Sequence, residues 1–376
     1  MEILQQILAF LCAPLVLFSG LIGFRGGVNE TQYQEYKNVI LFIGDGMGEN
    51  HLKAALADDP APLVMEAMPI RGQSNTNSWP GFLPTDSAAG ATALACGVRA
   101  IFNEIAVFPL DPLMWIATPA TLAELAIENG KLAGVVTTDS TSGATPACFS
   151  AHTASRNSEE AISVGQMASG LTLIWGGGSS SINEDGVRAG GFDALVTTKA
   201  QMEALEEGSR SFGQFGGLGG VPVPAGSPSL AEMTAAAIDL LDDGDGFFLM
   251  VEAAHIDKYS HSGDMPNTIK HVRTLDEAVA VALDYAAAHP ETLVLVTADH
   301  ETGGVQLQGG AYVFTFSEHT MANVPVLVNK TDAGFANGGV WKNRQIGVQL
   351  GRVLGFGPDV FPTPILPRLI LPVPYA

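Results

Sequence analysis

Short, mostly apolar runs recur along this chain, and they restrict its fold more than any other feature. The runs lie at residues 39–43, 133–137, 171–175, 246–251 and 292–297. They lack the apolar–polar alternation of a strand with one wet face. We therefore predict strands that are buried on both faces of a parallel sheet.

Helical patterns lie between these runs, at residues 121–128, 158–169, 230–241 and 275–288. An alternation of strands and helices is typical of a mainly parallel sheet that helices cover on both faces. The pattern predicts an α/β fold, a three-layer α/β/α sandwich with a mainly parallel central sheet.

The chain has 376 residues, of which 47% are hydrophobic and 15% charged, which indicates a globular protein with a sizeable core. We predict one domain over residues 38–355, after a polar linker at 28–37 and before a Pro-rich tail at 356–376. The stretch 176–229 is rich in Gly, Ser and Pro. We interpret it as an insertion that is mostly surface loop, with a short helix near 198–207.

The N-terminal residues 7–24 are apolar over a length that could span a bilayer. We interpret residues 1–27 as a signal peptide or membrane anchor, which predicts an exported protein, either periplasmic, extracellular or membrane-anchored. The charges speak against export, because Glu2 precedes the run and Arg25 follows it. A buried N-terminal helix is the alternative.

A net charge of −21 argues against nucleic acid as a partner, because nothing would neutralise the phosphates of its backbone. An anionic small substrate would need bound cations that reverse the local field. No Cys-x-x-Cys pair occurs among the 3 cysteines, so a zinc–thiolate site is not indicated. Cys96 and Cys148 are predicted to be small buried side chains, and a disulfide between them stays open.

Acidic side chains follow several of the predicted strands. Asp45 stands between two glycines after the first run, Glu252 follows the fourth, and Asp299-His300 closes the last. Open α/β sheets place their sites at the carboxyl ends of strands, so we expect these side chains to meet. Burial of Asp299 and His300 for packing alone would leave polar groups in need of partners, which favours a functional role. Asp45 alone could equally be a turn residue.

Asp257 and His261 are spaced by four residues, so they share one face if this segment is helical. A carboxylate and an imidazole at that spacing suit Zn²⁺, which accepts oxygen and nitrogen ligands. A lone pattern of this kind is usually surface decoration, and His319 is a weak signal by itself.

Ser87 follows Asp86 and precedes small residues that can form a helix. A serine there lies in the partial positive charge of the helix N-terminus, where a phosphate is favoured. Alone, the Asp86-Ser87 pair would be interpreted as an ordinary helix cap. Arg156 could grip two phosphoryl oxygens with its planar fork, although an isolated arginine is usually a surface residue.

Together these segments resemble the alkaline phosphatase family. The matching segments, in the family's order, are GDGMG at 44–48, TDSAAGATA at 85–93, ATPA at 144–147, HTASR at 152–156, MVEAAHIDKYSH at 250–261, TADHETGG at 297–304 and EHT at 318–320. Any one of them would be a weak signal, but so many in the right order are specific. The resemblance spans residues 38–319, most of the predicted domain.

The resemblance implies that Ser87 is the nucleophile and that Arg156 binds the phosphate. It also implies two zinc ions and one magnesium ion. The first zinc would be held by Asp257, His261 and His319, the second by Asp45, Asp299 and His300, and the magnesium by Asp45, Thr145 and Glu252. Asp86 and Lys258 would lie around these ligands, with Lys258 near the phosphate.

One position departs from the family pattern. The family usually has an Asp or a His two residues before Thr145, and here that residue is Gly143. The magnesium site therefore lacks a side chain, and we expect weaker magnesium binding or replacement of magnesium.

The function that the resemblance implies is metal-dependent hydrolysis of phosphate monoesters to an alcohol and inorganic phosphate, through a phosphoserine on Ser87. Members of the family often form dimers, which implies a homodimer. A phosphodiesterase or a sulfatase of the same superfamily is the first alternative, although diesterases commonly use threonine and sulfatases need a modified residue in another motif. A non-catalytic phosphate- or metal-binding protein is the second, and the nucleophile and zinc positions speak against it.

Overall fold

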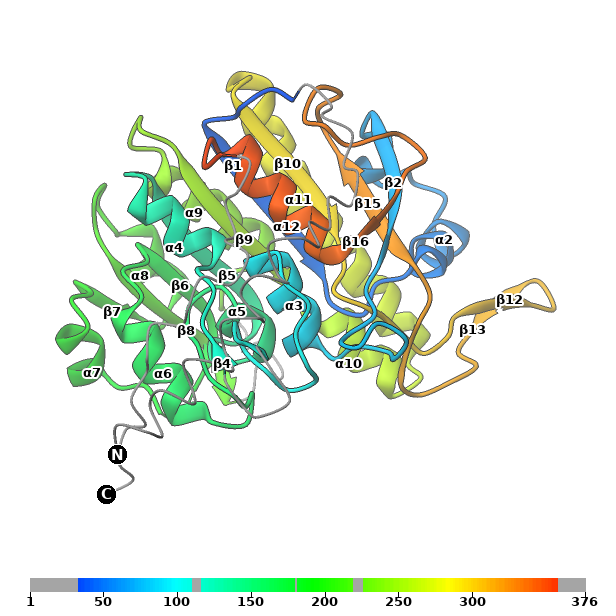
Figure 1. Cartoon of the computed structure of the whole chain (residues 1–376), viewed down its shortest axis with the longest axis horizontal. Helices are drawn as coiled ribbons and strands as arrows, with labels where there is room; N and C mark the ends of the chain where they lie inside the picture. The colour runs from blue at the N-terminus through cyan, green and yellow to red at the C-terminus, as the bar shows by residue number, and fades with distance from the viewer. Residues whose placement is uncertain (1–32, 110–115, 180, 219–225, 358–376) are drawn as a thin grey trace, which may run out of the picture. The chain divides into compact units, whose positions relative to one another are not determined.

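A ten-stranded sheet runs through the chain between two layers of helices (Figure 1). The computed structural model describes residues 33–109, 116–179, 181–218 and 226–357. The predicted signal or anchor at 1–27, residues 28–32 of the linker and residues 358–376 of the Pro-rich tail lie outside the described residues. None of the described helices is long and apolar enough to cross a membrane.

The strands of the large sheet follow one another in an order that mixes early and late parts of the chain. Across the sheet they are β16 (Val340–Lys342), β2 (Ile70–Asn75), β15 (Val324–Val328), β10 (Thr292–Thr297), β1 (Asn38–Gly44), β9 (Phe247–Ala253), β5 (Leu132–Ser140), β6 (Leu173–Gly178), β8 (Ser211–Leu218) and β7 (Ala194–Val196). Among the described strands of this large sheet, only β15 runs against its neighbours. The predicted fold class is confirmed.

Helices cover the two faces of this sheet (Figure 1). On one face α2 (Glu49–Asp58), α9 (Leu230–Leu241) and the long α11 (Met265–Ala288) pack together with the 3-10 turn η1 (Val64–Ala67). On the other face α3 (Ser87–Cys96), α4 (Leu122–Glu128) and α12 (Asn343–Val353) contact one another. Further short helices, α6 (Glu159–Ala168), α7 (Glu184–Ala189) and α8 (Lys199–Glu203), lie along the β6–β8 part of the sheet.

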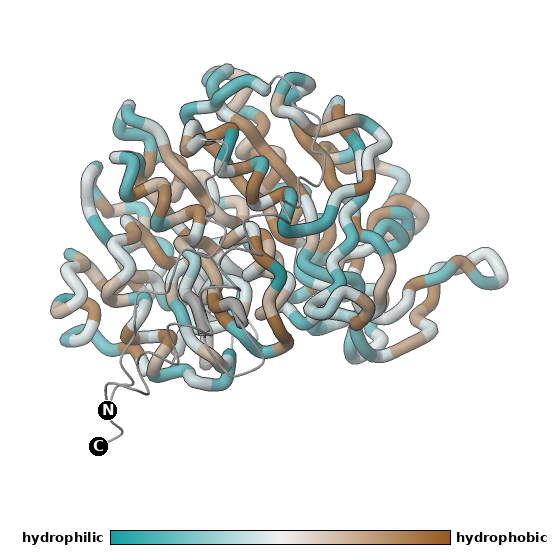
Figure 2. Tube along the Cα trace, in the orientation of Figure 1, coloured by the Kyte–Doolittle hydropathy of each residue, from teal (hydrophilic) through white to brown (hydrophobic). Residues whose placement is uncertain are grey.

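The core lies between the sheet and these helices. Every residue of β1, β9 and β10 is buried, as expected for strands that are covered on both faces. In Figure 2 the apolar colouring follows these central strands. The hydrophobic effect of this burial is what holds the three layers together.

The register of the central strands brings their carboxyl ends level. Ile43 of β1 pairs with Thr297 of β10 on one side and with Glu252 of β9 on the other. Glu252 in turn pairs with Thr137 of β5. The polar residues that end these strands therefore share one edge of the sheet.

The predicted strands and helices are confirmed, with two corrections. The helix predicted at 275–288 starts earlier, at Met265, because Asp264 caps it and a proline occupies its first turn. The interpretation of 176–229 as mostly surface loop is wrong, since β7 and β8 add two strands to the large sheet. Its glycines allow close packing: a Cβ on Gly213 would lie 2.7 Å from ring atoms of both Trp175 and Phe215.

The close contact between α3 and α12 depends on a glycine. A Cβ on Gly347 of α12 would lie 2.4 Å from the backbone oxygen of Leu94, and that oxygen belongs to α3. We expect Gly347→Ala to lower the free energy of unfolding by about 1–3 kcal/mol, because the helices must move apart. Urea denaturation measures this. Gly186→Ala in α7 is the matched control, since its Cβ would meet nothing closer than 3.5 Å and the helix should be unchanged or slightly more stable. Equal effects of the two substitutions would contradict this account.

Candidate active site

Ser87 lies at the start of α3, level with the carboxyl edge of the sheet. Asp86 caps this helix by accepting a hydrogen bond from the Ala89 N–H at 3.1 Å. Ser87 is buried, and its Oγ lies 3.2 Å from Nε2 of His300. The helix N-terminus adds partial positive charge at this hydroxyl, as an incoming phosphate requires.

Arg156 reaches the same helix start from a distant part of the chain. Its Nη1 donates to Asp86 Oδ2 at 3.1 Å, and that carboxylate oxygen also accepts the Asn103 N–H. Asp86 is almost fully buried, whereas about a third of the Arg156 side chain is exposed. The buried carboxylate thus anchors a guanidinium whose remaining N–H groups are left for a ligand.

One group of possible metal ligands consists of Asp257, His261 and His319, whose ligand atoms all lie within 4.8 Å of one another. The two imidazole Nε2 atoms are 3.0 Å apart. His261 Nδ1 lies 2.6 Å from the Ser317 carbonyl, and His319 Nδ1 lies 2.7 Å from the Thr85 carbonyl. A carbonyl can only accept, so each Nδ1 carries a proton and each Nε2 is the ring nitrogen that faces the group, which is the usual arrangement of a metal-binding histidine.

Local structure explains why these residues meet. Asp257 and His261 both lie on α10 (His255–His261), as their spacing predicts. His319 comes from β14 (His319–Thr320), which pairs with β11 (Glu301–Thr302) directly after the Asp299-His300 segment. The pairing of β14 with β11 therefore brings His319 to the sheet edge.

A second group of possible ligands consists of Asp45, Asp257 and His300. His300 Nε2 lies 3.4 Å from Asp45 Oδ1 and 3.3 Å from Asp299 Oδ2. Asp257 belongs to both groups, so one carboxylate joins them. The rings of His300 and His319 also stack, with their centroids 3.6 Å apart.

The oxygen atoms of this cluster fit a bound cation. Asp45 Oδ1, Asp299 Oδ2 and Thr145 Oγ1 are buried and have no hydrogen-bond partner among the described residues. Unpaired buried oxygens are costly, and a carboxylate more so than a hydroxyl. Divalent cations would supply the missing partner and charge, and the oxygen and nitrogen donors suit zinc.

Burial and mutual repulsion shift the titration of these side chains. Burial, together with Asp257, raises the pKa of Asp299 to about 7. Burial, together with the neighbouring Asp299, also raises the pKa of Asp45 well above its ordinary range. Burial and the nearby His319 lower the pKa of His300 well below its usual value, which keeps that imidazole neutral and able to bind metal.

Glu252 and Thr145 lie at the other end of the cluster. Glu252 is buried at the end of β9 and accepts a hydrogen bond from Thr137 of β5. Burial, followed by the charge of Asp139, raises the pKa of Glu252 to about 8. Thr145 sits on the short helix α5 (Ala144–Ala147), which begins directly after Gly143. Glu252 belongs to neither of the two ligand groups found among the described residues.

Sequence analysis assigned no role to three side chains of this site. Thr302 donates to Asp257 Oδ1 at 2.5 Å and lies 3.2 Å from His300 Nδ1, so it orients two ligands at once. Asp139 pairs with Lys258, and Thr137 holds Glu252. The position of Thr302 two residues after His300 hints at its role, but Asp139 and Thr137 follow only from the sheet register.

Cys96 and Cys148 are buried free thiols, so the predicted burial is confirmed and the disulfide is absent between these two residues. Cys148 Sγ lies 3.3 Å from Thr92 Oγ1 on α3. Cys96 is the last residue of α3, Cys148 packs against that helix, and both side chains are buried.

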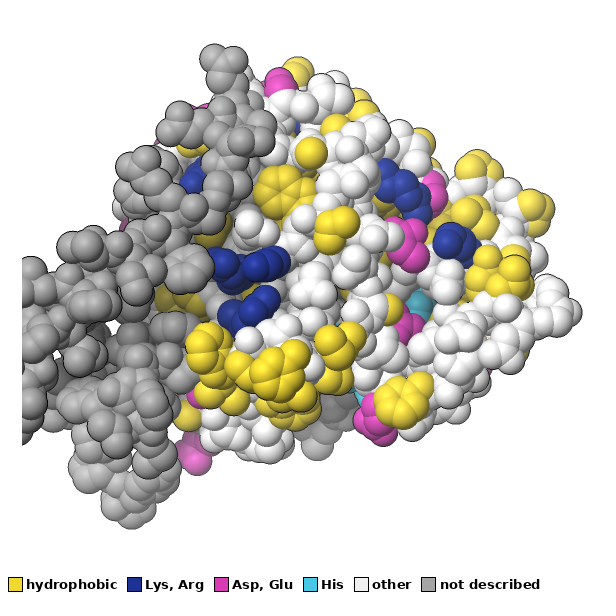
Figure 3. Space-filling model, turned by 45° about the vertical axis from the view of Figure 1, so that its right-hand side comes forward, with side chains coloured by type: hydrophobic (Ala, Val, Ile, Leu, Met, Phe, Trp, Pro, Cys, Tyr) yellow, Lys and Arg dark blue, Asp and Glu magenta, His cyan; other side chains and the backbone are white. Residues whose placement is uncertain are grey.

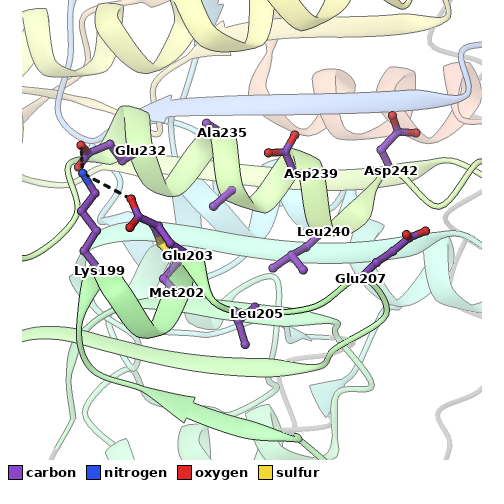
Figure 4. A pocket seen from close by; sticks show the side chains of 11 residues that line it. Lys199, Met202, Glu203, Leu205, Glu207, Glu232, Ala235, Asp239, Leu240 and Asp242 are labelled. Atoms are coloured by element: carbon purple, nitrogen blue, oxygen red, sulfur yellow. Dashed lines mark hydrogen bonds and ion pairs between the residues drawn. The ribbon is translucent and has the colours of Figure 1, made fainter.

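Histidine and acidic side chains reach the surface together on the face shown in Figure 3. His261 and His319 are partly exposed. A separate cavity of about 590 Å³ lies between α8 and α9 (Figure 4). It is lined by Glu203, Glu207, Asp239 and Asp242, and its Lys199 is bound to Glu232. This negative lining would repel a phosphate, so the cavity is no second site for one.

Comparison with known proteins agrees with the geometry. Residues 36–214 and 222–330 match the alkaline phosphatase family. This chain belongs to the alkaline phosphatase family. Alkaline phosphatase 3 of Bacillus subtilis is 32% identical over 346 residues, which is 84% of this chain and 73% of the relative. Streptomycin-6-phosphate phosphatase of Streptomyces griseus is 33% identical over 335 residues, 70% of this chain and 73% of the relative.

Solved structures of the family extend the likeness to three dimensions. The alkaline phosphatase of the Antarctic bacterium TAB5 superimposes with a TM-score of 0.76 at 28% identity, over 86% of this chain and 99% of the other. Single-residue variants of that enzyme are described with Mg bound in the M3 site. The family is metal-dependent, and this member of it is a hydrolase with the family's fold.

The raised carboxyl pKa values predict an unusual pH dependence for the metal-free protein. A carboxyl group with a raised folded pKa binds its proton more tightly in the folded chain than in the unfolded chain, where its ordinary pKa applies. Its contribution to stability is therefore complete below that ordinary pKa and is lost as the pH rises to about 7 for Asp299 and about 8 for Glu252. We expect the Tm of chelator-treated protein to fall from about pH 5 to about pH 8, as measured by differential scanning calorimetry.

Added Zn²⁺ should restore the Tm at the higher pH, because a bound cation neutralises the carboxylates that have lost their protons. Asp299→Asn is the matched control, since it removes one of the titrating groups and should flatten the fall. A Tm that rises with pH over the same range in chelator-treated protein would contradict the assignment.

Proposed function

We propose that this protein hydrolyses phosphate monoesters to an alcohol and inorganic phosphate through a phosphoserine on Ser87. The observation that carries the proposal is the placement of the Ser87 hydroxyl at a helix N-terminus, 3.2 Å from His300 and beside two groups of metal ligands. Hydroxyl, cation ligands and an anchored guanidinium together suit attack on a phosphoryl group.

The proposed ligands of the first zinc are Asp257, His261 and His319, and those of the second are Asp45, Asp299 and His300. Bound zinc would lower the pKa of a coordinated hydroxyl and stabilise the negative charge of a leaving alcohol. The unpaired buried oxygens of Asp45 and Asp299 support this assignment. A third cation, magnesium in our proposal, would be held by Asp45, Thr145 and Glu252, and Gly143 leaves that site with one side chain fewer.

In the proposed reaction the Ser87 oxygen attacks phosphorus in line with the leaving alkoxide. Arg156, held by Asp86, binds the equatorial phosphoryl oxygens, and the N-terminus of α3 stabilises the charge that builds up on them. A phosphoserine forms and water hydrolyses it, which frees Ser87 for the next cycle. Positioning and electrostatics supply most of the rate enhancement in such transfers.

Several proposals outside the catalytic site accompany this one. We propose that residues 38–355 form one catalytic domain and that the apolar N-terminal segment directs export or anchors the protein. We also propose a homodimer. Equilibrium ultracentrifugation tests the homodimer. Fractionation of cells that express the full chain tests export or anchoring.

Replacement of the nucleophile tests the mechanism. We expect Ser87→Ala to lower kcat for p-nitrophenyl phosphate by at least about a thousandfold and to abolish labelling by radioactive phosphate, while zinc content is kept. Ser163→Ala is the matched control, because Ser163 is buried on α6 and its Oγ has no hydrogen-bond partner in the described structure. A Ser87→Ala enzyme that retained its full rate would refute the assignment.

The choice between monoesters and diesters is tested by substrate comparison. A monoester offers three unesterified oxygens to Arg156 and the helix N-terminus, whereas a diester replaces one by a neutral ester oxygen. We expect kcat/KM for p-nitrophenyl phosphate to exceed that for bis(p-nitrophenyl) phosphate by at least about a hundredfold. A preference for the diester would favour a phosphodiesterase, and phosphate binding without release of alcohol would favour a non-catalytic protein.

A further inference from the structure

His152 lies four residues before Arg156 and joins two parts of the chain that are remote in sequence. Its Nε2 lies 2.9 Å from Oε1 of Glu124, and its Nδ1 lies 2.7 Å from the carbonyl oxygen of Ala106. A carbonyl and an ionised carboxylate can only accept, so both ring nitrogens carry protons. The two side chains are partly buried, at 21% exposure for His152 and 30% for Glu124. Neither takes part in the proposed reaction.

Glu124 is a fixed partner, because it also caps α4. Its Oε2 accepts the Thr121 N–H at 2.8 Å, and its own N–H donates to Thr121 Oγ1. Burial opposes the charge on His152, but the hydrogen bond and the negative charge of Glu124 outweigh it and raise the pKa of His152 above its usual value. The α4 helix therefore holds a charged imidazole whose Nδ1–H donates to the Ala106 carbonyl.

Residues 103–106 form a short segment that pairs with the backbone before Arg156. Ile105 and Thr153 exchange two backbone hydrogen bonds of 3.0 Å, as in an antiparallel ladder. The Arg156 N–H donates to the Asn103 carbonyl at 2.8 Å. The position of the Arg156 backbone therefore depends on the conformation of this segment.

The segment also contacts Asp86 and α3. The Asn103 N–H donates to Asp86 Oδ2 at 3.1 Å, and the same oxygen accepts a hydrogen bond from Nη1 of Arg156. Thr92 Oγ1 of α3 accepts the Ala106 N–H at 2.9 Å. A shift of the segment would therefore move both Arg156 and the carboxylate that anchors its guanidinium.

The two ends of the segment have a backbone conformation that most side chains disfavour. Asn103 has a φ of 73° and Ala106 a φ of 45°, and they are the only non-glycine residues with positive φ in the described part of the chain. An alanine in this left-handed region costs about 1–2 kcal/mol, whereas asparagine tolerates it better. Surrounding contacts must hold this conformation, and His152 supplies one of them at the Ala106 carbonyl itself.

We propose that His152 is a positioning residue for phosphate binding. Held by Glu124, its imidazole fixes the Ala106 carbonyl and with it residues 103–106, and this segment orients Arg156. The inference rests on the proposed function, because it assigns Arg156 to the phosphate of that reaction. A guanidinium that is already oriented loses less conformational entropy when phosphate binds.

Two substitutions of His152 separate its two hydrogen bonds. The amide of His152→Asn can replace Nδ1 and bind the Ala106 carbonyl, whereas that of His152→Gln can replace only Nε2, which faces Glu124. We expect His152→Gln to raise the Kd for inorganic phosphate, measured by calorimetry on the zinc-loaded enzyme, by about fivefold. His152→Asn should stay within about twofold of wild type. The matched control is His289→Asn, which removes a histidine paired with Asp242 near the amino end of β10 and should leave the Kd unchanged.

A double-variant cycle tests whether His152 acts through Arg156. In an Arg156→Ala background, His152→Gln should weaken phosphate binding no further, because no guanidinium is left to orient. Should His152→Gln fail to fold, Glu124→Gln provides the same measurement, since glutamine keeps the cap of α4 and removes the ionic partner. Glu124→Gln should raise the phosphate Kd by about threefold with Arg156 present and not at all without it.

Hydrogen exchange tests the effect on the segment without metal or turnover. In the metal-free protein, we expect the amides of residues 103–106 to exchange at least about tenfold faster in His152→Gln than in wild type. His152→Asn should exchange as wild type does, because it keeps the bond to the Ala106 carbonyl.

An unchanged phosphate Kd in folded His152→Gln would overturn the proposal and would leave the proposed function intact. Equal losses of affinity with and without Arg156 would also overturn it, as would equal exchange rates in His152→Asn and His152→Gln. A wild-type protein without monoesterase activity would refute the proposed function instead. The exchange measurement would then still report on His152 and residues 103–106.

Discussion

The rest of this structure depends on like-charged carboxylates that are buried side by side. Asp45 and Asp299 lie at the ends of neighbouring parallel strands, each with a buried oxygen that has no hydrogen-bond partner in the described structure. Such a cluster is unfavourable without compensating positive charge. Apolar burial in the sheet must offset this free-energy cost. The fully buried strands β1, β9 and β10 provide that burial.

The same constraint explains the arrangement around the cluster. Imidazoles face it with their Nε2 atoms, since backbone carbonyls accept the protons on Nδ1 of His261 and His319. On the side of the Ser87 hydroxyl, positive charge comes from Arg156 and from the N-terminus of α3.

Much of this could be predicted from the sequence because the central strands are continuous apolar runs with polar ends. Asp45, Glu252 and Asp299 follow such runs directly, and a parallel sheet aligns strand ends at one edge. The 176–229 stretch was misread because its glycines resemble loop glycines, although Gly213 is required by the rings of Trp175 and Phe215. Asp139 and Thr137 had no signal, since their roles depend on pairing partners that are far away in the chain.

Asp257 belongs to both groups of possible ligands, and this has a consequence for metal loading. Cations bound in the two groups would both be within reach of this one carboxylate. Binding of a first cation would therefore change the affinity of the other group, so the two positions would not fill independently. A centre with one cation would be a distinct chemical species with its own geometry, rather than half of the finished one.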